Sequence, residues 1–217
     1  MSITVLLADD HRMVREGFRL LLETQSDIKV IGEAGNGREA VRQAIKLAPD
    51  VILMDIAMPE LNGIEATKQI CEACPSIHIV ILSMYSTTQH IFRALKAGAK
   101  GYILKESAGD DVIKAVRMVH SGKTFLCDEI TGVVVGDYIE KREAGTTEDP
   151  LSGLSTRERE VLQLLVEGKS NTKIAELLFL SQKTIETYRS HLMQKLGISD
   201  LPGLVKFAIQ HGITSVE

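Results

Sequence analysis

The first 120 residues alternate short apolar runs with segments whose apolar residues recur at helical spacing. The apolar runs are rich in β-branched residues and are expected to form strands at 3–8, 28–34, 50–54, 78–83 and 101–105. Between the first two runs, Val14, Phe18, Leu21 and Leu22 recur at the spacing of an amphipathic helix. Near-continuous apolar strands that alternate with helices predict a parallel sheet covered on both faces. The pattern therefore predicts an α/β doubly wound domain with five parallel strands over residues 1–122.

From residue 151 to the end at residue 217 the pattern is helical throughout. Ser155 and Glu158 have the form of a capping box before an apolar run, and a glycine follows that run. Asn171, Ser181 and Asp200 open three further helical segments. Only the residues FLS separate the second helix from the third, and so tight a turn is typical of a helix-turn-helix. Residues 151–217 are therefore expected to form a small all-α domain.

Residues 123–150 separate these two parts and differ from both in composition. The segment EKREAGTTEDP at 140–150 is polar and acidic and predicts a linker. Just before it, residues 129–140 have a helical pattern in which Gly132 and Gly136 are unfavourable. We therefore expect 123–150 to be an acidic linker that is helical in part.

Composition narrows the class of protein further. The chain has 217 residues, 44% of them hydrophobic and 25% charged, which is ordinary for a globular protein. Its apolar runs are too short to span a bilayer, and its beginning has no basic region typical of a signal peptide. Three cysteines without a disulfide spacing favour a reducing compartment. We therefore expect a cytoplasmic protein that does not interact with membranes.

Charge is unevenly distributed along the chain. The net charge is −4 overall, but residues 126–150 carry −5 and residues 169–195 carry +3. The second value reflects a local basic patch on a weakly charged domain, and alone it is weak evidence for binding to nucleic acid.

Polar side chains stand at the carboxyl ends of four predicted strands. Asp9 and Asp10 follow the first strand, and Asp55, Ser83 and Lys105 mark the ends of the third, fourth and fifth. Ligands of doubly wound sheets bind at this edge. Clustered carboxylates repel one another and need a cation, for which Mg²⁺ is suited by its preference for oxygen ligands. With a lysine and a hydroxyl nearby, the set predicts phosphoryl transfer to Asp55, whose carboxylate can form an acyl phosphate.

Other interpretations of these residues remain open at this point. Each residue alone is better explained as a solvated strand end, a helix cap or a turn residue. An enzyme that uses Asp55 as a turnover nucleophile is a second alternative. Aspartate-dependent phosphatases typically carry a second acid two residues later, where this chain has Ala57. A third alternative is a regulator controlled by protein contacts, in which the phosphorylation site is vestigial.

The segments LLADDH (6–11), MDIAMPELNG (54–63), ILSMY (81–85) and AGAKGYILK (97–105) resemble the receiver domain of two-component response regulators. The resemblance covers residues 1–122. It implies that Asp55 is the phosphoacceptor and that Mg²⁺ is bound by Asp9, Asp10, Asp55 and the main-chain carbonyl of Ala57. It further implies that Ser83 and Lys105 contact the phosphoryl group and that Tyr102 is the aromatic switch residue.

The C-terminal segments REREVL, NTKIAELL and SQKTIETYRSHLMQKL resemble, in order and spacing, the LuxR-type helix-turn-helix of NarL/FixJ-class regulators. We place this motif at about residues 171–190, with the helix from Gln182 as the recognition helix. Such a helix presents its N-terminal side chains to base edges and phosphates. A solvated polar face on a small bundle is the alternative. The predicted DNA-binding residues are Lys173, Lys183, Thr184, Glu186, Thr187, Arg189 and Ser190.

Together the two resemblances imply a transcription factor and not an enzyme. DNA binding would be controlled by phosphorylation of Asp55, with a histidine kinase as phosphodonor and Mg²⁺ as cofactor. The phosphorylated protein is expected to be a homodimer that binds paired half-sites. RNA polymerase is a further candidate partner.

Overall fold

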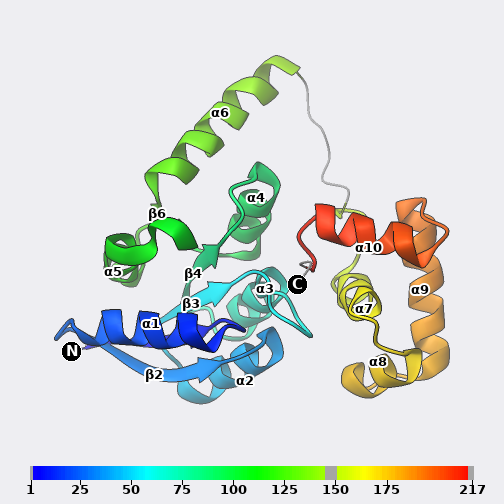
Figure 1. Ribbon diagram of the computed structural model, residues 1–217, viewed down its shortest axis with the longest axis horizontal. Helices are drawn as coiled ribbons and strands as arrows, with labels where there is room; N and C mark the ends of the chain where they lie inside the picture. Colours follow the sequence, from blue (N-terminus) through cyan, green and yellow to red (C-terminus); the bar gives the residue numbers. More distant parts are fainter. Residues whose placement is uncertain (1, 145–150, 215–217) are drawn as a thin grey trace. The chain divides into compact units, whose positions relative to one another are not determined.

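The computed structural model describes residues 2–144 and 151–214, which form two compact units divided between Thr146 and Thr147. Each unit is described by itself, and its elements can be followed by colour and label in Figure 1. In the N-terminal unit the helices are α1 (Arg12–Glu23), α2 (Gly37–Leu47), α3 (Gly63–Ala73), α4 (Thr88–Ala97), α5 (Ala108–His120) and α6 (Asp128–Ala144). The strands are β1 (Ile3–Ala8), β2 (Ile28–Ala34), β3 (Val51–Asp55), β4 (His78–Ser83), β5 (Gly101–Leu104) and β6 (Phe125–Leu126).

The six strands form one parallel sheet in the order β2-β1-β3-β4-β5-β6. The predicted parallel α/β sheet is confirmed, but the predicted count of five strands is wrong by one. The additional strand, β6, has two residues and pairs Phe125 with Gly101 and Leu126 with Tyr102. A two-residue strand is too short to show any periodicity in the sequence. It also forms only where the edge of β5 is available for pairing.

Helices cover both faces of this sheet. On one face α1 and α5 contribute Leu22 and Val116 to a core with alternate strand residues such as Val5. On the other face α2, α3 and α4 pack against the intervening strand residues, for example Ile70 against Ile52. Both faces of every central strand are therefore buried, which explains why the strands have near-continuous apolar sequences.

The sixth helix extends beyond the predicted helical segment. α6 spans Asp128–Ala144 and therefore enters the segment expected to be a linker, while residues 145–150 lie outside the described residues. Ile130 is fully buried, and Val133 and Val134 pack against the core on the side of α4. This packing offsets the cost of two glycines in the helix, about 1 kcal/mol each relative to alanine.

The C-terminal unit is entirely helical over its described residues, as predicted. Its helices are α7 (Thr156–Val166), α8 (Asn171–Leu178), α9 (Gln182–Leu196) and α10 (Leu201–Gln210). Ser155 and Glu158 form the expected capping box, and Ser170, Ser181 and Asp200 cap the other three helices. Within residues 2–144 and 151–214, no helix is long and apolar enough to cross a membrane.

The turn between α8 and α9 has a conformation that a side chain disfavours. Phe179 caps α8 with a φ of 56°, in the left-handed region. Leu178 and Leu180 on either side of it pack into the helical core with Ile174 and Ile185. This packing holds the short turn and sets α9 against α8.

A partly buried ion pair, in which Glu158 is buried and Lys195 is exposed, links α7 to α9 and provides a stability test. The Nζ of Lys195 lies 2.8 Å from Oε2 of Glu158, which also accepts the main-chain N–H of Ser155. Burial raises the pKa of Glu158, but Lys195 and Ser155 outweigh it, so the pKa is lowered. A carboxyl with a lowered pKa stabilises the fold above its unfolded pKa, and that stability is lost as the pH falls through its folded pKa.

Glu158→Gln is therefore expected to lower the free energy of unfolding of the C-terminal unit by about 1 kcal/mol at pH 7. The difference from the wild type should vanish at a pH below the folded pKa, where Glu158 is itself protonated. Chemical denaturation of the full chain at several pH values measures both quantities. Glu176→Gln removes an exposed ion pair with Lys173 and serves as the control. An equal effect of the two substitutions would contradict the prediction.

Candidate functional site

The predicted polar residues do meet at one edge of the sheet. Asp9 directly follows β1, Asp55 and Ser83 are the last residues of β3 and β4, and Lys105 directly follows β5. These four strands are consecutive neighbours in the sheet and all are parallel. Their carboxyl ends therefore bring together side chains that lie up to 96 positions apart in the sequence.

Lys105 bridges two of the carboxylates at this edge. Its Nζ lies 2.7 Å from Oδ2 of Asp9 and 2.9 Å from Oδ2 of Asp55. The side chains of both aspartates are only 4% exposed, so water screens the interaction weakly. Asp10 is partly exposed beside them. Lys105 is thus paired with two carboxylates, and a third, that of Asp10, lies beside them against His11.

Burial and the neighbouring charges together set the protonation equilibria of the site. Burial raises the pKa of Asp55 to about 6, with Asp9 and Asp10 adding to the rise and Lys105 opposing it. Burial acts to lower the pKa of Lys105, but Asp55 and Asp9 outweigh it, so the pKa is raised and the ammonium stays charged. A buried carboxylate held beside like charges is stabilised by an added cation.

The acidic group has a geometry that a metal ion can use. Asp9, Asp10, His11 and Asp55 each offer one ligand atom, and these atoms all lie within 4.8 Å of one another. His11 is the exposed residue that precedes α1, and its Nδ1 is 2.7 Å from Oδ1 of Asp10. A hard divalent cation such as Mg²⁺ prefers carboxylate oxygens to an imidazole nitrogen, so the three aspartates are better ligands for it than His11 is. The residues present therefore fit Mg²⁺.

The loop after β3 carries Ala57, whose main-chain carbonyl was expected to be a metal ligand. This loop is fixed by the N–H of Gly63, which donates to the carbonyl of Ile56 at 2.9 Å, and by Asn62, which caps α3. A Cβ on Gly63 would overlap the carbonyl oxygen of Asp55. Glycine is required there because α3 begins directly against the end of β3.

Ser83 and Tyr102 are connected through Tyr85. The hydroxyl of Ser83 accepts the N–H of Tyr85 at 2.9 Å, and the hydroxyl of Tyr102 donates to the carbonyl of Tyr85 at 2.7 Å. Both Ser83 and Tyr102 are fully buried. Burial raises the pKa of the Tyr102 phenol, so it stays protonated and can donate. The two predicted switch residues therefore form hydrogen bonds with the N–H and the carbonyl of the same residue, Tyr85.

Tyr85 also contacts α4, a link that sequence reasoning did not identify. Its ring stacks on that of His90, with centroids 4.8 Å apart, and Nδ1 of His90 lies 2.5 Å from the hydroxyl of Thr87. His90 is buried at the start of α4. Tyr85 lies within the segment ILSMY, but nothing in the pattern of apolar residues shows that its ring packs on α4.

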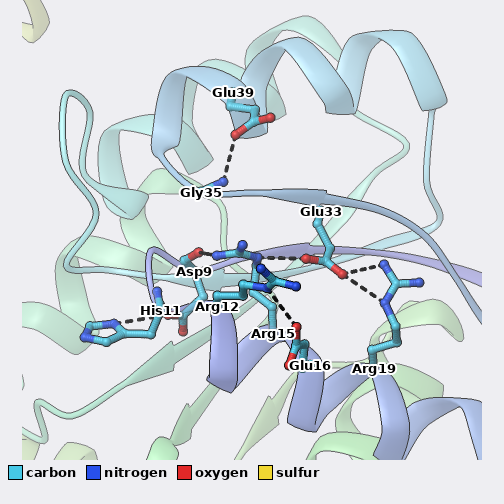
Figure 2. Close-up of polar contacts among 9 residues, drawn as sticks. All are labelled: Asp9, His11, Arg12, Arg15, Glu16, Arg19, Glu33, Gly35 and Glu39. Atoms are coloured by element: carbon cyan, nitrogen blue, oxygen red, sulfur yellow. Dashed lines mark hydrogen bonds and ion pairs between the residues drawn. The ribbon is translucent and has the colours of Figure 1, made fainter.

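Besides its side-chain contacts, Asp9 has a main-chain partner that the sequence did not indicate. Figure 2 shows Arg15 donating from Nη1 to the carbonyl of Asp9 while its Nε donates to Glu33, which also binds Arg19. The spacing of Arg15 and Arg19 is that of one helix face, but their partner Glu33 comes from β2. Such a contact depends on tertiary structure.

The second candidate site lies on α9. Lys183, Glu186, Thr187 and Ser190 are all exposed, and their spacing places them on one face of the helix. Ile185 and Leu192 are fully buried on the opposite side. The exposed face of α9, defined by these four residues, therefore presents a cation, a carboxylate and two hydroxyls.

The remaining predicted DNA-binding residues differ in their surroundings. Lys173 lies 3.1 Å from the carboxylate of Glu176, and Thr184 shares a hydrogen bond with the hydroxyl of Ser181 in the cap of α9. Arg189 is half-buried and lines a shallow pocket with Lys169 and the first residues of α8. Lys169 belongs to the basic patch but was not among the predicted DNA contacts.

Two known families match separate parts of the chain. The family described as "Response regulator receiver domain" matches residues 5–117. The family described as "Bacterial regulatory proteins, luxR family" matches residues 152–208. The first match covers the whole candidate phosphorylation site, and the second covers the exposed face of α9.

Similar proteins match over nearly the whole chain. The oxygen regulatory protein NreC of Staphylococcus carnosus (strain TM300) is 40% identical over 209 residues, which cover 95% of this chain and 96% of that protein. The RcsB response regulator of Salmonella typhimurium is 31% identical, with a TM-score of 0.60 over 95% of this chain and 97% of its own. A structure of an RcsB–DNA complex has 30% identity and a TM-score of 0.61 over 97% and 99% of the two chains. The chain belongs to the two-component response regulators in which a receiver domain precedes a LuxR-type DNA-binding domain, and it is a transcription factor controlled by phosphorylation.

Proposed function

We propose that Asp55 is the phosphoacceptor of this regulator and that a histidine kinase is the phosphodonor. The observation that carries the proposal is the convergence of Asp55, Lys105 and the acidic pair at one edge of the sheet. A carboxylate oxygen of Asp55 attacks phosphorus, the P–N bond of the donor phosphohistidine breaks, and the bonding electrons return to the imidazole, which takes up a proton. The product is an acyl phosphate on Asp55.

Mg²⁺ is the proposed cofactor, held by Asp9, Asp10, Asp55 and the main-chain carbonyl of Ala57. When bound, it neutralises charge on the phosphoryl oxygens and on the crowded carboxylates. Lys105 supplies a fixed positive charge 2.9 Å from the accepting carboxylate. The hydroxyl of Ser83 supplies a hydrogen-bond donor to the phosphoryl group.

The switch follows from the bonds that Ser83 makes without phosphate. In this structure the Ser83 hydroxyl accepts the N–H of Tyr85, and on phosphorylation its side chain turns toward the phosphoryl group and leaves that bond. Tyr85 also accepts from Tyr102 and stacks on His90, so its movement changes the contacts of α4. Phosphorylation thus shifts an equilibrium between two arrangements of β4, α4 and Tyr102.

The output is DNA binding by the C-terminal domain. We propose a receiver domain at 1–122, a connecting segment at 123–150 and a DNA-binding domain at 151–217, with the helix-turn-helix at about 171–190. The phosphorylated form is a homodimer that binds paired half-sites, and RNA polymerase is a further candidate partner. In the described part of the C-terminal unit, α10 exposes an apolar strip that suits a dimer contact, formed by Leu201, Pro202, Val205 and Ile209.

Asp55 functions as a switch and not as a turnover nucleophile. Ala57 stands two residues after Asp55, where a phosphatase of this chemistry has its general acid. An acyl phosphate without a general acid beside it persists long enough to change the conformation. The protein acts in the cytoplasm, where DNA and the kinase domain are both accessible.

The test is DNA binding by the wild-type chain with and without a small phosphodonor such as acetyl phosphate. We expect Mg²⁺ with phosphodonor to tighten binding to DNA by about ten-fold or more, a coupling typical of two-state switches. Chelation of Mg²⁺ with EDTA before the phosphodonor is added should remove the effect. Fluorescence anisotropy of a labelled duplex measures the affinities. Equal affinity under the three conditions would overturn the proposal.

A further inference from the structure

The main chain of Asp9 is hydrogen-bonded through both its N–H and its carbonyl. Its N–H donates to the carbonyl of Ala34 at 3.1 Å, and its carbonyl accepts from Nη1 of Arg15 at 2.7 Å. The carboxylate is oriented in addition by the N–H of His11, 2.9 Å from Oδ1. Asp9 therefore leaves β1 in one fixed conformation, and Arg15 is the side chain that contributes to it.

Arg15 is itself clamped from β2. Its Nε lies 2.9 Å from Oε2 of Glu33, while the second oxygen of Glu33 accepts from Nε of Arg19 at 2.9 Å. The side chains of Arg15 and Glu33 are 15% and 26% exposed, so the clamp is mostly shielded from water. Hydrogen bonding from Arg15 lowers the pKa of Glu33, with Arg19 adding to the effect against burial, so the carboxylate stays charged. Shielded charged hydrogen bonds of this kind are the strong ones.

Arg12 provides a contrast in the same turn of α1. Its side chain is 82% exposed and pairs with Glu16 on the same helix. Figure 2 shows it directed toward Glu16, while Arg15 lies between Asp9 and Glu33. Both arginines add positive charge near the acidic pair, but only Arg15 is bonded to the main chain that carries it.

We propose that Arg15, clamped by Glu33 and Arg19, is a positioning residue that fixes the main chain of Asp9 and thereby orients the acidic pair for Mg²⁺. This inference rests on the proposed function, in which Asp9 and Asp10 hold the metal. Groups that orient metal ligands without touching the metal typically contribute 10- to 100-fold to metal affinity. Arg15 acts through a carbonyl and not through its charge.

The positive charge of Arg15 and its hydrogen bond to the Asp9 main chain predict opposite effects of Arg15→Ala on the binding of Mg²⁺. Removing a cation near three carboxylates strengthens the binding of Mg²⁺ if electrostatics alone matters. Releasing the main chain of Asp9 weakens the binding. Arg15→Lys separates the two further, because it keeps the charge but cannot bridge the Asp9 carbonyl and the Glu33 carboxylate as the planar guanidinium does.

The experiment is a titration of the unphosphorylated full chain with Mg²⁺, followed by NMR shifts of main-chain amides at constant ionic strength. Arg15→Ala and Arg15→Lys are each expected to weaken Mg²⁺ binding by about ten-fold. Arg12→Ala, the matched control, should bind Mg²⁺ as tightly as the wild type or more tightly. Thermal unfolding without Mg²⁺ identifies a temperature at which every variant is folded, and the titrations are made there. If Arg15→Ala does not fold, the conservative Arg15→Lys still gives a result.

Asp10→Asn separates failure of this inference from failure of the proposed function. If Asp10→Asn does not weaken Mg²⁺ binding, the acidic pair does not hold the metal and both proposals fail. If Asp10→Asn weakens binding but both Arg15 variants bind Mg²⁺ at least as tightly as the wild type, the positioning role alone is overturned. Weaker binding in Asp10→Asn and in both Arg15 variants, with Arg12→Ala unaffected, supports the proposal.

Discussion

Asp55→Asn is expected to abolish phosphorylation of this regulator by acetyl phosphate and, with it, the phosphodonor-dependent gain in DNA affinity. An amide has no anionic oxygen to attack phosphorus, and no other group takes its place at the end of β3. Asp9 and Asp10 are near but are held by Lys105, His11 and the proposed metal. Intact-mass spectrometry of the treated protein measures the added phosphoryl group directly.

The control for this loss is an aspartate outside the site. Asp27 is 44% exposed and pairs with Arg117. Asp27→Asn should therefore be phosphorylated like the wild type and should respond to phosphorylation normally. If Asp55→Asn gained the phosphoryl group as fast and as completely as the wild type, with the same chemical lability, Asp55 would not be the acceptor.

The second large effect is expected on α9. Lys183→Ala and Arg189→Ala should each weaken DNA binding by about ten-fold, and the double variant by about 100-fold, if each cation contributes roughly 1.4 kcal/mol. Within residues 2–144 and 151–214, neither side chain has a hydrogen bond or ion pair; Lys183 is exposed, and Arg189 is half-buried where it lines an open pocket. The loss of two phosphate or base contacts should also flatten the salt dependence of binding by about two units of slope.

A control variant that also loses one positive charge separates direct contact with DNA from general electrostatic attraction to it. Lys206→Ala removes one exposed positive charge from α10 and should weaken binding much less than either α9 variant. Binding is measured by anisotropy over a range of salt concentrations, with a duplex selected from a random pool by the phosphorylated wild type. If Lys206→Ala and Lys183→Ala reduce affinity and salt slope equally, α9 does not read DNA.

The strands were predictable because their burial leaves a local signal. β1, β2 and β4 begin and end at the predicted residues. β1 and β4 are covered on both faces and are apolar along their length, while the edge strand β2 keeps enough apolar and β-branched residues to show the same signal. β6 left no such signal, because its two residues pair only with an edge that β5 provides. The full length of α6 was hidden for a related reason, since its glycines disfavour a helix that tertiary packing then stabilises.

The candidate phosphorylation site could be predicted from one rule about parallel sheets. Strands with a common direction end at a common edge, so Asp9, Asp55, Ser83 and Lys105 could be grouped without coordinates. The partners that hold them could not be predicted. Whether a lysine is free or paired also needed the structure: Lys173 and Lys183 look alike in sequence, but only Lys173 has a carboxylate beside it.

The sequence by itself determined the parallel α/β class, the helical C-terminal unit and the residue types gathered at the sheet edge. These properties depend on periodicity and on strand direction, which are local in the chain. Only the tertiary structure decided how the site is held: Arg15 binds the Asp9 carbonyl, and Tyr85 joins Ser83 to Tyr102. The physical reason is that the Arg15–Asp9 and Tyr102–Tyr85 bonds each join a side chain of one element to the main chain of another segment, while the local Ser83–Tyr85 bond matters only because Tyr85 is held by these other contacts. No residue pattern records such a distance.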